Sequence, residues 1–152
     1  MRNIFVLAVA LGFALPVAAD DRLAAFQGGI GSQPLRAGAL TNDVNGVQPG
    51  GRPWVISDLR ADIRTDGRIR VDGRGLLLAG GNNVGRPGIQ DVHARLFCGT
   101  VPHNSPAVRV EANGDFRIEG ELTPLPPTDC ATPVLLIVSA GGNWFAAGIP
   151  KE

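Results

Sequence analysis

Hydrophobic and polar positions alternate most regularly from Val55 to Leu78, a stretch that reads VISDLRADIRTDGRIRVDGRGLLL. In both halves of the stretch, apolar or small side chains take every second position, and charged side chains take most of the positions between them. Such alternation is typical of a β-strand with one buried face and one solvated face. The central Thr65-Asp66-Gly67 sequence suits a three-residue turn closed by a left-handed glycine. The stretch therefore predicts a β-hairpin.

The turn also fixes the register of this hairpin, because a three-residue loop sets Arg64 opposite Arg68. A two-residue loop would place Ile63 opposite Arg70 and mix the two faces, a shift that sheets resist. The charged ladder on the outer face is expected to be structural, since cross-strand ion pairs contribute only about 0.2–1 kcal/mol each. The predicted pairs, counted outward from the turn, are Ile63 with Ile69, Asp62 with Arg70, Ala61 with Val71, Arg60 with Asp72, and Asp58 with Arg74.

Two further regions have the same alternating pattern. Residues 91–98 predict a strand with Cys98 on its inner face. Residues 107–122 predict a second hairpin around Asn113-Gly114. Its loop is Ala112-Asn113-Gly114 if turn chemistry decides, and Asn113-Gly114-Asp115 if the pairing of charged side chains decides. Both alternatives keep the same side chains on the inner face.

An almost unbroken apolar run follows at residues 133–140. It is too short to cross a membrane as a helix and suits a strand buried on both faces. A turn at 141–143 leads into a last strand over 144–149. Altogether the pattern predicts about seven or eight short strands and no amphipathic helix. We therefore expect an all-β fold, a single antiparallel β-sandwich, with a small β-barrel as the alternative.

The first residues have the composition of a secretory signal peptide. A basic Met1-Arg2-Asn3 start is followed by an apolar run and by the small residues Val17-Ala18-Ala19. We predict a signal peptide over residues 1–19 and export to the periplasm or the extracellular space, with no transmembrane segment after cleavage. Residues 20–152 are expected to be one domain, with a Gly-rich N-terminal segment over 20–53 and a β core over 54–150.

Cysteine and charge content narrow the class of protein. Cys98 and Cys130 are the only cysteines, and in an exported chain an even number predicts a disulfide. The 14 Lys and Arg residues are balanced by 14 Asp and Glu residues, and the two signs are interleaved along the chain. Because no basic patch is visible, a nucleic-acid partner is not expected.

The two histidines offer the one candidate metal-binding pattern. Asp91 and His93 would share one face of a strand, and His103 follows in the next loop, so three ligands for zinc or copper could converge. Ser105 lies two residues after His103, but no nucleophile elbow surrounds it. We therefore expect no catalytic residues and no bound cofactor. A metal-binding or hydrolytic protein that uses Asp91, His93 and His103 is the alternative.

The function expected from the sequence is that of an exported, non-catalytic binding or interaction module. The loops Ala79–Gly88 and Gly99–Pro106 are the predicted surfaces for a protein or glycan ligand. A second alternative is a structural or assembly subunit, in which edge strands of the Gly-rich N-terminal segment pair with another chain.

Overall fold

The computed structural model describes residues 21–37 and 40–152, and the predicted signal peptide over 1–19 lies outside the described residues. Two short strand pairs stand apart from the main sheet: β2 (Arg36–Ala37) with β3 (Leu40–Thr41), and β4 (Trp54–Val55) with β7 (Leu77–Leu78). The main sheet contains nine strands: β1 (Arg22–Gly31), β5 (Asp58–Arg64), β6 (Arg68–Arg74), β8 (Asp91–Phe97), β9 (Pro102–Asn104), β10 (Val108–Arg109), β11 (Phe116–Glu121), β12 (Val134–Ser139) and β13 (Trp144–Pro150).

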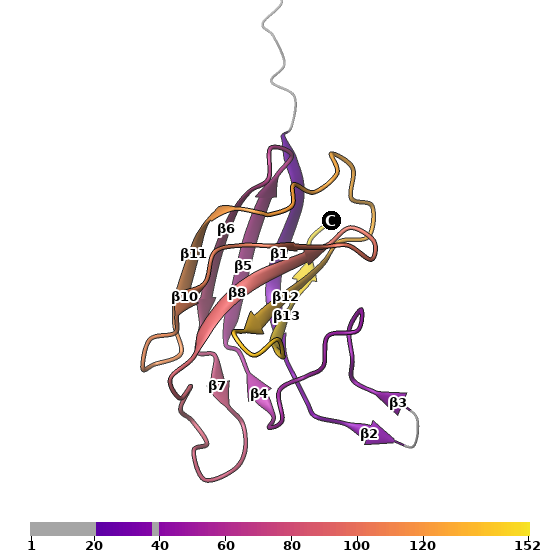
Figure 1. Ribbon diagram of the computed structural model, residues 1–152. Helices are drawn as coiled ribbons and strands as arrows, with labels where there is room; N and C mark the ends of the chain where they lie inside the picture. The colour runs from indigo at the N-terminus through magenta and orange to yellow at the C-terminus, as the bar shows by residue number, and fades with distance from the viewer. Residues whose placement is uncertain (1–20, 38–39) are drawn as a thin grey trace, which may run out of the picture.

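These nine strands form one antiparallel sheet that curls into a half-barrel (Figure 1). The strand order is β10-β8-β12-β13-β1-β5-β6-β11, and β9 also pairs with β8. The two ends of this order approach each other because β10 and β11 are joined by a short turn. Backbone bonds of 2.9 Å in both directions between Asn104 and Thr123 then tie the end of β9 to the chain that leaves β11.

The predicted all-β, antiparallel fold with one disulfide is confirmed, and Cys98 is bonded to Cys130. In the part of the chain that is described there is no helix. The strands form one curled sheet, because β1 pairs on one side with β13 and on the other with β5. The small barrel named as the alternative therefore describes their arrangement more closely than two stacked sheets. Within residues 21–37 and 40–152, no helix has the length and apolar character needed to cross a membrane.

The hairpin of β5 and β6 has the predicted register. Ile63 lies opposite Ile69, and the four further pairs up to Asp58 with Arg74 are also as expected. The turn is the three-residue type: the N–H of Gly67 donates to the Arg64 carbonyl at 3.0 Å, and Gly67 has a φ of 87°. A glycine with positive φ relieves the steric strain that a side chain would create at this position.

The second hairpin uses the Ala112-Asn113-Gly114 loop. Glu111 donates its N–H to the Asp115 carbonyl at 2.9 Å, and Gly114 donates to the Glu111 carbonyl at 2.9 Å. Turn chemistry therefore decides the register. The two arginines of this hairpin form ion pairs with carboxylates on neighbouring strands instead. Arg109 pairs with Asp91 on β8, and the Nε of Arg117 lies 2.7 Å from the Asp72 carboxylate on β6.

Apolar side chains are buried on both faces of β12, as the sequence predicts. Leu135 and Ile137 belong to the main core inside the curl. Leu136 and Val138 belong to a second cluster on the outer face, which the segment around Val47 covers. The outer face of β5, β6 and β11 instead carries exposed charged side chains. The outer face of the curled sheet therefore has one region that is covered by the chain and one that is exposed to solvent.

The contact between Gly73 and Phe116 predicts a stability effect. The two residues lie opposite each other on β6 and β11, and a Cβ atom on Gly73 would overlap the Phe116 ring. Because overpacking forces side chains and backbone to shift, Gly73→Ala should lower the free energy of unfolding by about 1–3 kcal/mol in urea denaturation. Gly51→Ala is the matched control, since a Cβ there meets nothing within 4 Å. Equal stability of the two variants would contradict the packing described here.

Candidate functional site

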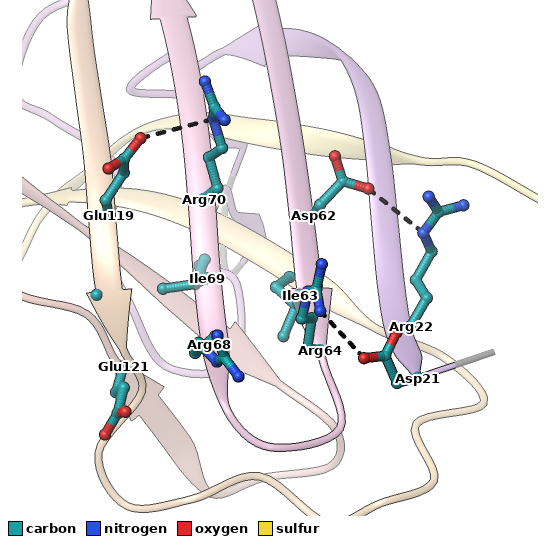
Figure 2. A pocket seen from close by; sticks show the side chains of 11 residues that line it. Asp21, Arg22, Asp62, Ile63, Arg64, Arg68, Ile69, Arg70, Glu119 and Glu121 are labelled. Carbon is teal, nitrogen blue, oxygen red and sulfur yellow. Dashed lines mark hydrogen bonds and ion pairs between the residues drawn. The ribbon is translucent and has the colours of Figure 1, made fainter. Parts of the chain in front are cut away.

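A groove crosses the outer face of β1, β5, β6 and β11 beside the β5–β6 turn (Figure 2). It has a volume of about 680 Å³ and is open to solvent. We call it the charged groove, because four arginines and four carboxylates stand around it. Its lining residues are Asp21, Arg22, Asp62, Ile63, Arg64, Arg68, Ile69, Arg70, Glu119, Gly120 and Glu121.

One wall of the charged groove is a row of alternating charges that the sheet register aligns. Asp62, Arg70 and Glu119 stand opposite one another on β5, β6 and β11. Arg22 on β1 extends the row, with its Nε 3.4 Å from the Asp62 carboxylate. The Nε of Arg70 lies 3.7 Å from the Glu119 carboxylate, as Figure 2 shows. Because these side chains start on four hydrogen-bonded strands, the row is positioned by the sheet itself.

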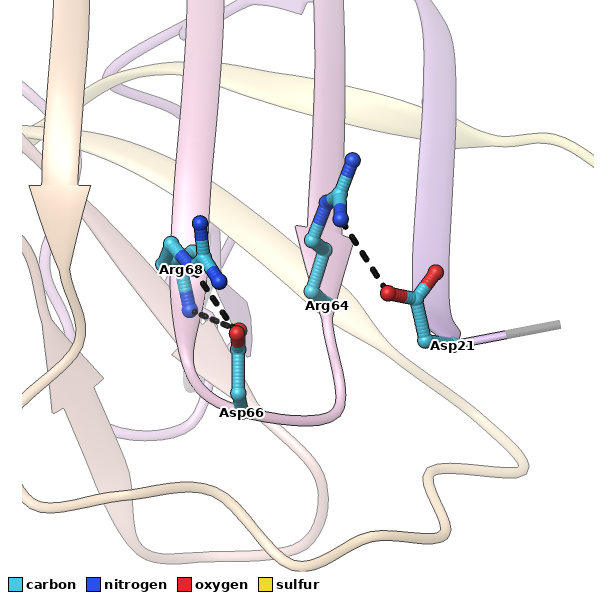
Figure 3. Close-up of polar contacts among 4 residues, drawn as sticks. All are labelled: Asp21, Arg64, Asp66 and Arg68. Carbon is cyan, nitrogen blue, oxygen red and sulfur yellow. Dashed lines mark hydrogen bonds and ion pairs between the residues drawn. The ribbon is translucent and has the colours of Figure 1, made fainter. Parts of the chain in front are cut away.

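The other wall lies two residues further along the strands, at the tip of the β5–β6 hairpin. An Nη1 atom of Arg64 lies 3.1 Å from the Asp21 carboxylate at the start of β1 (Figure 3). Arg68 stands opposite Glu121 on β11, and its Nε lies 2.8 Å from the Asp66 carboxylate in the turn. This second row therefore has two adjacent guanidinium groups at its centre and carboxylates at its ends.

Between the two walls, the floor of the groove is formed by residues whose side chains do not point out of the sheet into the groove. Ile63 and Ile69 point into the core, where both are nearly fully buried, and Gly120 has no side chain. Since residues on one face of a strand repeat every two positions, the walls are about 7 Å apart, and four strands make the groove about 14 Å long. These dimensions suit a single extended chain of small units.

Electrostatic contacts hold the arginines of the groove in place. Asp66 accepts hydrogen bonds from the backbone N–H of Arg68 at 3.0 Å and from its Nε at 2.8 Å. These bonds lower the pKa of Asp66, and the bond to its carboxylate raises the pKa of Arg68. Arg68 and Arg70 each reach their carboxylates through Nε. Among the described residues no hydrogen bond has an Nη amine of Arg68 or Arg70 as its donor, so these amines remain as donors for a ligand.

The charged groove offers a ligand both positive and negative groups. Guanidinium and carboxylate groups alternate in the first row, whereas the second row has guanidinium groups at its centre and carboxylates at its ends. A polar ligand would find both donors and acceptors along the length of the groove.

The sequence predicts the β5–β6 hairpin, which supplies about half of the residues of the charged groove. It does not predict that the groove exists. Asp21, Glu119 and Glu121 come from β1 and β11, which are distant from the hairpin in sequence. Periodicity predicts which face of a strand is wet, but it does not say which strand lies beside it. The one available signal is that Glu119 and Glu121 alternate with apolar positions, as the charged residues of the hairpin do.

The structure does not bring Asp91, His93 and His103 together. His93 lies opposite Val138 of the outer cluster, whereas His103 lies opposite Leu96 of the main core, so the two rings are on opposite faces of the sheet. Asp91 pairs with Arg109. The Nδ1 of His103 is 2.8 Å from the Pro124 carbonyl. Over residues 21–37 and 40–152, no three His, Cys, Asp or Glu side chains form a group that could hold a metal ion.

Ser105 also has structural partners. Its Oγ donates to the Pro106 carbonyl at 2.9 Å and accepts the backbone N–H of Ala94 at 2.8 Å. The hydroxyl is therefore engaged in holding the chain after β9 against β8. This position gives the hydroxyl a role in the fold, and Ser105 does not line the charged groove.

The two loops predicted as binding surfaces lie at opposite ends of β8 (Figure 1). Ala79–Gly88 precedes this strand and Gly99–Pro106 follows it, and seven residues of strand separate them by about 20 Å. Within the Gly-rich N-terminal segment, β1 has a neighbour on each side, whereas β2 and β3 pair only with each other.

His93 provides a test of the outer face of β8. Burial disfavours its charged imidazolium and lowers its pKa, and the Arg95 guanidinium lowers it further, while a hydrogen bond with Asn104 opposes both. The folded protein therefore binds this proton less tightly than the unfolded chain does, so stability falls as the pH drops below the ordinary imidazole value of about 6.5. We expect an NMR titration to place the pKa of His93 below that value.

A variant separates this effect from general acid denaturation. His93→Gln carries no titrating ring, so it should lose less stability than the unmodified protein between neutral pH and about pH 5. Identical losses in the two proteins, measured by urea denaturation, would show that His93 titrates normally. Above about pH 7 the histidine is neutral in both states, and this contribution vanishes.

Comparison of the chain with models of known protein families, with curated proteins and with solved structures finds no match in any of the three.

Proposed function

We propose that this protein is an exported β-domain that binds a polar ligand in the charged groove and does not transform it. The observation that carries the proposal is the alignment of two charged rows across four strands, with the terminal amines of Arg68 and Arg70 available between them. Binding sites gain affinity when their side chains are ordered before the ligand arrives. The carboxylate contacts of Arg64, Arg68 and Arg70 provide that order.

Export is part of the proposal. The first 19 residues have the pattern of a secretory signal peptide. The Cys98–Cys130 disulfide is compatible with an oxidising compartment such as the periplasm or the extracellular space. A ligand outside the cytosol would meet the groove on a domain that the disulfide stabilises.

The proposal is tested by mapping ligand binding with NMR. The purified protein, with its disulfide formed, is titrated with acidic oligosaccharides, neutral oligosaccharides and charged peptides, and its backbone amide shifts are followed. A ligand of the groove should shift amides of residues 62–70 and 119–121, and the shifts should disappear in an Arg68→Gln/Arg70→Gln variant. Shifts confined to other regions would contradict the proposal, as would the absence of any response.

A matched control uses arginines on the same sheet face that do not line the groove. Arg60 pairs with Asp58, and Arg117 pairs with Asp72. An Arg60→Gln/Arg117→Gln variant removes the same number of positive charges from neighbouring positions. It should bind as the unmodified protein does if the groove is the site, because exposed ion pairs contribute little to the fold and their loss leaves the groove in place.

A further inference from the structure

We infer, on the basis of the function proposed above, that the ligand of the charged groove is a short acidic glycan. Its carboxylate would bind the central guanidinium groups of Arg64, Arg68 and Arg70, and its hydroxyls would bind the flanking carboxylates. Three features of the groove support this ligand class: the order of charges along it, the residues absent from its lining, and its shape.

The order of charges selects a ligand with one anionic centre. Arg64, Arg68 and Arg70 stand on the two middle strands. Asp62 and Glu119 flank Arg70 in the first row, and Asp21 and Glu121 stand at the two ends of the second row. A long polyanion would place further negative charges against those carboxylates, which is unfavourable. A basic chain would face three guanidinium groups. A sugar acid presents one carboxylate for the centre and neutral hydroxyls for both sides.

Hydroxyl groups match the flanking positions because each is both a donor and an acceptor. A sugar hydroxyl can donate to Asp62 or Glu119 and accept from the Nη amines of Arg70. No Trp, Tyr or Phe lines the groove. The large apolar contact that aromatic rings provide is therefore missing, so charge must supply most of the affinity, and a neutral sugar would bind poorly.

The shape of the groove favours a glycan over an extended peptide. Peptides that bind sheets obtain much of their affinity from backbone hydrogen bonds to an exposed strand edge. In the floor of the groove, β5 and β6 each have hydrogen-bonded neighbours on both sides, so the backbone of Ile63 and Ile69 offers no such edge. A ligand lying across the strands must be held by side chains alone.

The experiment compares three probes of similar length by isothermal titration calorimetry: a trisaccharide with one uronic acid between two neutral hexoses, the corresponding neutral trisaccharide, and a tripeptide with one central acidic residue. The uronate trisaccharide should bind, and its affinity should fall as salt is added. Because each substitution removes a charge-assisted hydrogen-bond donor, Arg68→Gln/Arg70→Gln should weaken binding at least about tenfold. The Arg60→Gln/Arg117→Gln control should retain the original affinity.

Each other outcome is decisive. Equal affinity for the neutral trimer would overturn the role of the carboxylate. Binding of the peptide but not of the uronate trisaccharide would overturn the glycan inference and leave the charged groove as a binding site. Binding of no probe, together with no amide shifts at residues 62–70, would overturn both proposals. Because the substituted arginines are exposed, urea denaturation of each variant should confirm that the fold is intact.

Discussion

Removal of the Cys98–Cys130 disulfide is expected to lower the free energy of unfolding by about 3–4 kcal/mol. The two cysteines are 32 residues apart, and the closed loop contains β9, β10 and β11. Without the bond, the unfolded chain gains the entropy of opening that loop, which favours the unfolded state. The Cys98→Ala/Cys130→Ala variant in urea denaturation gives this difference directly. An unchanged denaturation midpoint would show that the bond constrains little.

Two further measurements identify the origin of the effect. Adding a reductant should destabilise the unmodified protein and leave the Cys98→Ala/Cys130→Ala variant unchanged. The variant should also unfold with a steeper dependence on urea, because an unfolded chain without the cross-link exposes more surface. A stability loss with no change of slope would place the contribution of the bond in the folded state, where it joins the end of β8 to the loop before β12.

The parts of the fold that the sequence predicts well are those decided by neighbouring residues. Gly67 closes a three-residue turn, and this turn alone determines the whole β5–β6 register. At residues 111–115, the sequence offered two registers because turn chemistry and charge pairing disagreed. The turn prevails because Gly114 adopts a left-handed φ of 87°, whereas exposed arginines reach carboxylates on whichever strand is near.

The parts that could not be predicted depend on the order of strands in space. Alternation marks Arg70 and Glu119 as outward-facing, but only the pairing of β6 with β11 places them side by side. The same limit explains why the N-terminal segment was expected at an edge: nothing local to β1 shows that β13 and β5 both pair with it. The charged groove is therefore a property of the sheet and not of any one segment.

The alternation that defines an inner and an outer face also explains the separation of the two histidines. His93 and His103 lie on adjacent antiparallel strands, but they occupy positions of opposite direction in the pleat. The two histidines are only ten residues apart in the sequence. Such a short separation does not bring two side chains together when the chain turns back and pairs with the strand that it has just left, because the side chains can point to opposite faces of the sheet.

The second prediction with a large effect concerns the outer cluster that covers β12. Leu136 is fully buried and packs with Val138, Phe97 and Trp144 under the segment that contains Val47. Leu136→Ala should lower the free energy of unfolding by about 2–5 kcal/mol, because it removes apolar contacts and leaves a cavity. Urea denaturation measures the loss, and Leu125→Ala at an exposed position is the control.

The size of the stability loss in Leu136→Ala shows whether the outer cluster is a second, tightly packed core or a loosely covered surface. If the segment around Val47 can collapse onto the space left by Leu136, the loss will fall near the lower limit; a rigid cover will give a loss near the upper limit. Hydrogen bonds hold the segment around Val47 in place. Trp144 donates its indole N–H to the Asn42 carbonyl at 3.1 Å, and Val44 and Val47 donate backbone N–H groups to each other's carbonyls. We therefore expect this segment to be rigid. Should Leu136→Ala fail to fold, Leu136→Val tests the same site with a smaller cavity. A loss below about 1 kcal/mol for Leu136→Ala would mean that the outer face of β12 contributes little to stability and that the curled sheet is held from its inner face alone.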